Sequence, residues 1–326
     1  MSICPSTEFS LEAFPLGLKG WHHIQFASPL RIPVTLPIAV AKSASGGPTI
    51  VVTGLVHGDE FEGPSAISRL FFDLQLHAGT FIGLPLTNPW AHAGQSRNTP
   101  KHFDGLNLAR QFPGLAEGSR TQQLAHLLYQ WVTGLLGPND LLIDLHSAGS
   151  RYEYLSMVGY HPTDDDTESA SRELAAAFGF RNLWQIPDSP SSRRTLNGSI
   201  ARAGIPTIGT EVRGFGGLRS LDVDLLVNGI RRVLAVKGMV ADEPPTTEDV
   251  PIQTTHQIVF STSGLFNADV DLADTVQAGQ PLGRVLTIQG ETVETLIAPV
   301  DGQVWAIRRF ASVHPGDIAF LIAQPI

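Results

Sequence analysis

The sequence predicts an α/β fold with a mostly parallel, mixed sheet and helices on both faces, followed by a small all-β module. In the first two-thirds, short apolar segments alternate with longer ones that carry apolar residues at helical spacing, which is typical of a parallel sheet covered on both sides. From Gln257 onward only short strand-like segments and Gly/Asp/Pro turns remain. Between these parts lies the polar, proline-rich stretch ADEPPTTEDVPIQTT. We therefore expect an α/β domain over 1–245, a linker over 241–255 and a β module over 255–326.

The strands of the α/β domain are predicted from short apolar runs bounded by turn residues. Several of these runs are apolar at nearly every position, as expected for strands buried on both faces. The candidates are Thr35–Ala41, Thr49–Val56, Thr80–Leu86, Leu141–His146, Leu155–Val158 and Pro206–Val212.

Four helices are predicted between these strands from apolar residues at helical spacing. The first begins near Pro64, where proline suits the first helical turn. The third follows the acidic triplet 164–166, whose carboxylates favour the positive end of a helix dipole. The second runs from about Arg120 to the Gly137-Pro138 break, and the fourth covers roughly Leu221–Val240.

Composition excludes several classes of protein. The chain has 326 residues, 42% hydrophobic and 16% charged, which is typical of a globular protein. A formal charge of −9 argues against nucleic-acid binding, which needs a basic face. The single cysteine, Cys4, excludes an internal disulfide framework and a cysteine-based zinc site. Residues 1–19 lack the features of a secretion signal and no apolar run reaches the ~18 residues of a membrane helix. A cytoplasmic protein without membrane or nucleic-acid partners is expected.

Two metal-ligand types follow the predicted strand Thr49–Val56. His57 and Glu60 lie in a turn opened by Gly58. A nitrogen and an oxygen donor are two of the three protein ligands of an open catalytic zinc site. Ligands in α/β folds gather beyond the carboxyl ends of the strands, and this turn occupies such a place.

His146 is the candidate for the third ligand. It ends the predicted strand Leu141–His146 and is followed by small turn residues. Parallel strands that end at one sheet edge would bring His57, Glu60 and His146 together. Asp144, two residues earlier on the same strand face, can orient a ligating imidazole.

A long irregular segment between predicted elements carries two arginines, Arg97 and Arg110. Long loops in compact domains are usually functional. A guanidinium group can bind a carboxylate through two hydrogen bonds or stabilise a developing oxyanion.

Glu211 ends the apolar strand Pro206–Val212. Because charged residues are rarely buried without a partner, a structural role would be unusual there. Its carboxylate suits a general base that deprotonates water and then protonates a leaving amine.

These motifs together resemble the succinylglutamate desuccinylase/aspartoacylase family, which is itself similar to zinc carboxypeptidases. The resemblance rests on His57-x-x-Glu60, Arg97, Asn-Leu-x-Arg-x-Phe-Pro-Gly around Arg110, Asp144-x-His146 and Glu211, and covers roughly 46–213. The β tail also resembles the C-terminal module of that family.

The resemblance implies one zinc ion per chain on His57, Glu60 and His146. It also implies that Arg97 polarises the scissile carbonyl, that Arg110 holds a substrate carboxylate and that Glu211 is the base. We expect Asn107, from the same motif, to contact the substrate as well.

One position departs from the family pattern. Ala109 stands where the family usually has an asparagine, so an amide that helps to grip the substrate carboxylate is missing. Arg213 is one of the arginines that can compensate for this loss, and we expect it to bind substrate.

The C-terminal segment also resembles the barrel-sandwich domains that carry biotin or lipoate, in phrases such as VQAGQPLG and APVDGQV. Those carriers need a modifiable lysine, and this segment contains none. A structural or lid role is therefore expected.

The motifs and the resemblance together predict a zinc-dependent amidohydrolase that removes the acyl group from an N-acyl amino acid or a related small amine. A metallocarboxypeptidase acting on short peptides is the first alternative. A catalytically inactive, metal-retaining metabolite-binding protein is the second; Ala109 favours it, whereas the intact Glu211 and Arg97 argue against it. The expected partner is a small N-acyl substrate, and a homo-oligomer is left open.

Overall fold

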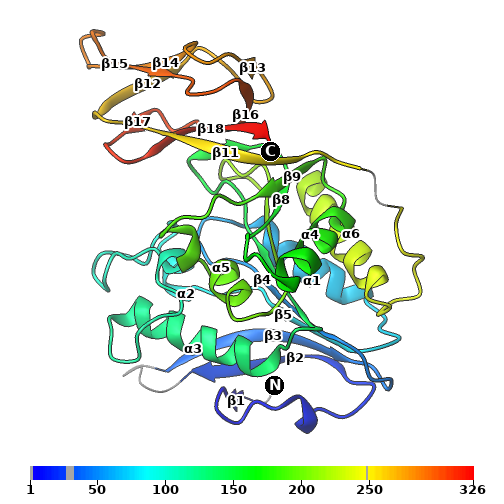
Figure 1. The fold of residues 1–326 in the computed structure, drawn as a ribbon. Coiled ribbons are helices and arrows are strands. Elements are labelled where there is room, and N and C mark those ends of the chain that lie inside the picture. The colour runs from blue at the N-terminus through cyan, green and yellow to red at the C-terminus, as the bar shows by residue number, and fades with distance from the viewer. Residues whose placement is uncertain (1–2, 27–32, 247–248) are drawn as a thin grey trace.

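The computed structural model describes residues 3–26, 33–246 and 249–326. One large mixed sheet runs through the molecule in the order β1-β2-β3-β5-β4-β6-β10-β8-β9-β11-β18-β16-β13 (Figure 1). A second sheet of four strands, β15-β14-β12-β17, packs at the C-terminal end. The α/β fold with a mostly parallel sheet and an all-β C-terminal part is therefore confirmed. Among the described residues, no helix is both long and apolar enough to cross a bilayer.

The centre of the large sheet consists of four neighbouring parallel strands. They are β5 (Thr80–Leu84), β4 (Thr49–Thr53), β6 (Leu141–Leu145) and β10 (Thr207–Glu211), in that order. In β4, β5 and β6 every residue is buried, as the continuous apolar runs predict. The chain leaves β4 and β6 before His57 and His146, so both histidines lie in turns beyond the strand ends.

Further strands extend the sheet on both sides of this centre. On one side lie β3 (Val34–Lys42), β2 (Lys19–Phe26) and β1 (Ile3–Pro5); on the other lie β8 (Met157–Tyr160) and β9 (Asn182–Gln185). The sequence predicted β3 and half of β8, at Met157 and Val158, but not β2 or β9. Only two of the eight residues of β2 are buried, so its pattern lacks the apolar run on which the prediction depends.

Helices cover both faces of the sheet, as predicted. The helices α1 (Glu62–Asp73), α4 (Asp166–Phe178) and α6 (Ser220–Val236) share one apolar core with the sheet. On the opposite face, α3 (Arg120–Leu135) and α5 (Leu196–Ala201) share the second core. Alternate residues of β4 divide between the two cores: Ile50 and Val52 join the first and Val51 the second. The short helices α2 (Pro89–Ala93), η1 (Leu11–Ala13), η2 (Leu108–Arg110) and η3 (Ser192–Arg194) lie in loops.

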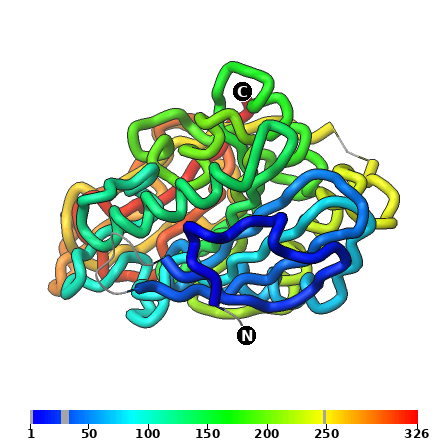
Figure 2. Tube along the Cα trace, turned by 90° about the horizontal axis from the view of Figure 1, so that it is seen from below, coloured from blue at the N-terminus to red at the C-terminus, as the bar shows by residue number. Residues whose placement is uncertain are grey.

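The C-terminal strands are hydrogen-bonded to the main sheet. Strands β11 (Ile252–Val259), β18 (Ile318–Pro325), β16 (Gly302–Arg308) and β13 (Thr275–Val276) continue it, and β7 (Tyr152–Tyr154) pairs with β16. The second sheet contains β12 (Gly264–Ala268), β14 (Pro281–Leu286), β15 (Thr292–Ile297) and β17 (Ser312–Val313). The expected linker 241–255 overlaps β11, because Ile252 and Gln253 pair in parallel with β9. Figure 1 shows the N-terminal strands and this module at opposite ends of the molecule, and Figure 2, seen from below, shows the N-terminal strands in front.

Candidate metal centre and active site

The structure brings His57, Glu60 and His146 together. One potential ligand atom from each lies within 4.8 Å of the others, and all three residues are buried. His57 and Glu60 follow β4, and His146 follows the neighbouring strand β6. The turn between the first two requires Gly58, because a Cβ there would collide with the backbone of Ala91.

Glu60 lies between the two imidazoles. Its Oε1 is 2.6 Å from His57 Nδ1, and its Oε2 is 2.8 Å from His146 Nδ1. Burial disfavours the charge of Glu60, but the two histidines outweigh this effect and hold the pKa of Glu60 below its usual value. Burial and the charge of Arg97 lower the pKa of His57 to about 4, so this imidazole stays neutral, which is the state that binds metals.

The outer nitrogens of both imidazoles are also held. His146 Nε2 is 3.2 Å from Asp144 Oδ2, and Asp144 in turn accepts a hydrogen bond from Thr53 Oγ1 at 2.7 Å. This is the orienting position expected for Asp144. His57 Nε2 is 3.1 Å from Asn107 Oδ1, which also accepts a hydrogen bond from Ala109 N at 2.9 Å. Asn107 was expected to contact substrate, but in this structure its side-chain oxygen orients His57 and begins the η2 turn.

Glu211 ends β10 beside this cluster. It is half-buried, and its Oε2 has no hydrogen-bond partner among the described residues. Burial, reinforced by the nearby charge of Glu60, raises the pKa of Glu211 to about 8. Burial is the usual way in which enzymes bring a carboxyl group into the range where it can take up and return a proton near neutral pH.

Arg97 and Arg110 both reach the cavity above the cluster. Arg97 donates a hydrogen bond to Glu60 Oε1 at 3.1 Å, and 37% of its side chain is exposed. Arg110 donates only to the carbonyl of Ala109, at 2.7 Å, and has no carboxylate partner among the described residues. Burial and the neighbouring Arg97 lower the pKa of Arg110 to about 10. A half-buried cation without a counter-ion is ready for an anionic group of a ligand.

The cavity has a volume of about 470 Å³ and is lined by His57, His146, Glu211 and both arginines. Its remaining wall comes from elements that the sequence did not connect with function. They are the segment from His161 into α5, with His161, Trp184 and Asn197, and the module residues Thr255, His256, Gln257 and Pro299. Trp184 Nε1 donates to Thr255 Oγ1 at 3.1 Å, which fastens this part of the wall to β11. The only signal in the sequence was the position of His161 just after a predicted strand.

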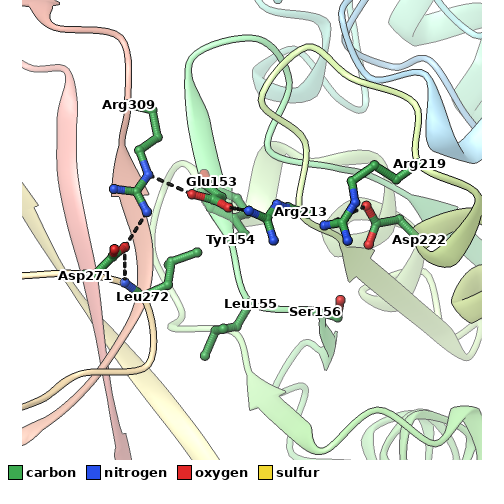
Figure 3. A pocket seen from close by; sticks show the side chains of 10 residues that line it. All are labelled: Glu153, Tyr154, Leu155, Ser156, Arg213, Arg219, Asp222, Asp271, Leu272 and Arg309. Atoms are coloured by element: carbon green, nitrogen blue, oxygen red, sulfur yellow. Dashed lines mark hydrogen bonds and ion pairs between the residues drawn. The ribbon is translucent and has the colours of Figure 1, made fainter.

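Arg213 does not reach this cavity. Its guanidinium is paired with Glu153, which also accepts from Arg309 Nε at 2.7 Å (Figure 3). Arg309 is in turn paired with Asp271. These four residues, called the ion-pair cluster below, line a separate cavity of about 370 Å³ between β7, the loop after β10 and the module. Arg213 was expected to bind substrate; in this structure it is instead held by Glu153, and the substrate contact stays a prediction.

Comparisons with known proteins agree with this geometry. Residues 46–237 match the model of the succinylglutamate desuccinylase/aspartoacylase catalytic domain. The N-alpha-acetyl-L-2,4-diaminobutyric acid deacetylase of Halomonas elongata is 32% identical over 311 residues, which cover 90% of this chain and 86% of the relative.

Two solved structures resemble the whole chain. A succinylglutamate desuccinylase/aspartoacylase from Rhodobacter sphaeroides has a TM-score of 0.82 at 26% identity, covering 96% of this chain and 98% of that one. The product-bound ectoine utilization protein EutE (DoeB) of Ruegeria pomeroyi also has a TM-score of 0.82, at 25% identity and with 95% and 97% coverage. With the motif residues assembled at one sheet edge, these matches show that the chain belongs to the succinylglutamate desuccinylase/aspartoacylase family.

Proposed function

We propose that this protein is a zinc-dependent deacylase that hydrolyses the amide bond of an N-acyl amino acid. The observation that carries the proposal is the position of Glu211. A carboxyl group with an unpartnered oxygen lies beside a buried His57–Glu60–His146 set in one cavity. The deacetylase relative and the family support an N-acyl amino acid as the substrate.

The three residues fit a zinc ion. Two imidazole nitrogens and one carboxylate are the donor set of many catalytic zinc sites, in which one position stays open for water or substrate. Both Nδ1 atoms face the Glu60 carboxylate, while both Nε2 atoms are bonded elsewhere, so Nδ1 is the nitrogen left for a metal. A zinc ion held there would supply Lewis acidity to a water molecule and to the scissile carbonyl.

The side chains around the cluster each have a different role in the reaction. Glu211 takes the proton of the attacking water and returns it to the leaving amine. Arg97, held by Glu60, directs its remaining N–H groups at the carbonyl oxygen, where negative charge develops. Arg110 binds the carboxylate of the amino acid through its unpaired guanidinium.

The test combines metal analysis with a substrate panel. The purified protein should hold one zinc per chain, and His57→Ala and His146→Ala should each lose it. The zinc-loaded protein should release amine from N-acetyl amino acids and leave C-terminal dipeptides largely intact. Stoichiometric zinc in both histidine variants would refute the metal site. Preferred cleavage of dipeptides would instead favour the carboxypeptidase alternative.

A further inference from the structure

The part of the metal cavity away from the ligands is polar but carries no permanent charge. Apart from Glu211, Arg97 and Arg110, no described residue that lines this cavity is an aspartate, glutamate, lysine or arginine. Its wall consists instead of hydroxyl, amide, imidazole and apolar groups, including Ser191, Ser192 and Thr195. Arg97 is already bonded to Glu60, whereas Arg110 has no carboxylate partner among the described residues.

Two arginines near this wall are held away from it. Arg193 and Arg202 both pair with Asp188, the second at 2.6 Å. None of these three residues lines the metal cavity. They therefore supply no cation for a second acidic group of a ligand.

His161 offers a hydrogen-bond acceptor in this wall. Asn197 Oδ1 accepts from the backbone N–H of Gly198 at 2.8 Å, and a backbone N–H can only donate, so this atom is the amide oxygen. His161 Nε2 lies 3.0 Å from the same oxygen and must carry the proton. Burial lowers the pKa of His161 to about 4, so the ring is neutral and its Nδ1 is an unprotonated acceptor. Nδ1 has no partner among the described residues, and the side chain is only 2% exposed.

The His161–Asn197 pair packs against the strand that ends in Glu211. A Cβ on Gly209 would collide with Asn197 Nδ2, so the glycine in this strand makes room for the amide. Gly209 and Glu211 lie two residues apart in β10 and therefore point to the same face of the sheet. The His161–Asn197 pair thus lies on the face of the sheet to which Glu211 points.

We infer that this wall is the subsite for the side chain of the amino acid and that His161 selects a side chain with a hydrogen-bond donor, such as an ammonium or amide group, against a carboxylate. This inference rests on the proposed function. Arg110 can hold one carboxylate, and the α-carboxylate occupies it. At His161 a side-chain carboxylate would meet an acceptor instead of a donor, and no described lysine or further arginine lines the wall to neutralise it.

The test compares substrates that differ only in the end of the side chain. N-acetylasparagine and N-acetylaspartate have nearly the same shape, and Nα-acetyl-2,4-diaminobutyrate adds an ammonium group. The values of kcat/KM should be at least about tenfold higher for the amide and the amine than for the acid. Equal or faster hydrolysis of N-acetylaspartate would overturn the inference.

Two variants test the residue assignment. Ser191 is exposed and lines the cavity, so its replacement should not disturb the core. Ser191→Arg should raise kcat/KM for N-acetylaspartate relative to N-acetylasparagine, because it adds a cation to the wall. Thr295→Arg, on exposed β15, makes the same charge change elsewhere and should leave the ratio unchanged. His161→Gln can present an N–H group to the substrate. It should reduce the preference for the amide and amine substrates over N-acetylaspartate, provided that its melting temperature stays close to the parent value. An unchanged ratio in both Ser191→Arg and folded His161→Gln would contradict the assignment.

Binding of the products separates this inference from the proposed function. If the zinc-loaded protein hydrolyses none of the three substrates, the proposed function fails. The subsite is then decided by the melting temperature in the presence of 2,4-diaminobutyrate, asparagine or aspartate. A larger stabilisation by the first two supports the subsite, and a larger stabilisation by aspartate refutes it.

Discussion

Two buried glutamates of this protein, Glu60 and Glu153, each lie among charged side chains but differ in their surroundings. Glu60 lies between His57, His146 and Arg97, and Glu153 lies between Arg213 and Arg309. Both side chains are almost fully buried, with 1% and 8% exposure. The first group lies at the edge of the parallel strands, and the second joins β7 to the module (Figure 3).

The difference lies in what surrounds each glutamate. Among the described residues around Glu60, one oxygen of Glu211 has no hydrogen-bond partner and Arg110 has no carboxylate partner, and both residues line a cavity. In the ion-pair cluster, each of the four charged residues is matched by an opposite charge. A dense group of charges is therefore no mark of an active site by itself. Groups left unpaired beside a cavity are the better sign.

The largest difference between the two sites should appear when one carboxyl group is replaced at each of them. Glu211→Gln should keep its zinc and lower kcat by about two to four orders of magnitude, with little change in KM, because a general base acts in the transition state. Glu153→Gln should keep kcat close to the parent value. Steady-state kinetics with metal analysis measures both. Near-normal kcat in Glu211→Gln would remove the proposed mechanism.

The same Glu153→Gln variant should show its effect in stability. Loss of the buried charge leaves two guanidinium groups with weaker partners and should lower the free energy of unfolding by about 1.5–3 kcal/mol. Both arginines are partly exposed, so solvent limits the cost. Urea denaturation of the metal-free proteins measures the loss, with Arg284→Ala, which removes an exposed ion pair of the module, as the control. A loss no larger than that of the control would show that the cluster does not hold the module.

Asp144 and Asp271 should differ in their effect on zinc affinity. Asp144→Asn weakens the orientation of His146 and should reduce zinc affinity by roughly 10–100-fold. Asp271→Asn, the matching change in the ion-pair cluster, should leave it unaltered. Competition with a chromogenic chelator gives both constants. Equal affinities would mean that Asp144 does not support the ligand.

Arg110 should act in binding. Arg110→Ala removes the guanidinium that we propose to bind the substrate carboxylate and should raise KM by roughly tenfold to a hundredfold, with a small change in kcat. Arg309→Ala removes an arginine of the ion-pair cluster and should leave KM unchanged. An unaltered KM in Arg110→Ala would exclude the carboxylate contact and reopen the class of substrate.

The stability of the metal-free protein should also depend on pH through Glu211. In the folded metal-free protein the pKa of Glu211 is about 8, above its ordinary value of 4.5. Between these values the folded state holds a proton that the unfolded chain has released. This contribution to stability is complete below pH 4.5 and is lost as the pH rises through 8. Stability should therefore fall with pH by at most about 1.4 kcal/mol per pH unit from this group.

Comparing the metal-free parent with Glu211→Gln isolates that contribution. Urea denaturation from pH 5 to 9 should give a shallower decline for the variant. Parallel curves would show that Glu211 does not retain its proton on folding.

Much of the fold and the centre of the site could be predicted because both depend on local patterns. The runs that became β4 and β6 are mostly apolar, and β10 is buried at four of its five positions. Each proposed ligand or base lies at or beyond the end of one of these strands. Parallel pairing then fixes where these residues meet.

The remaining features depend on contacts between distant segments, which no local pattern encodes. Asn107 contacts His57 across 50 positions, and Arg213 meets Glu153 through the folding of β7 against the module. The tautomer of His161 follows from the direction of one amide. For the same reason β9 was missed, since four residues between a helix and a loop become a strand only beside their partners.

The parallel pairing of β9 with β11 has a practical consequence for anyone who shortens this chain. A fragment that ends before Ile252 would keep β9 but lose the strand that covers its outer side. The exposed backbone N–H and C=O groups of β9 would then form an unpaired sheet edge that can pair with a strand of another molecule. Such a fragment should be prone to aggregation. Shorter versions of the protein should therefore be made by trimming internal loops and not by removing the module.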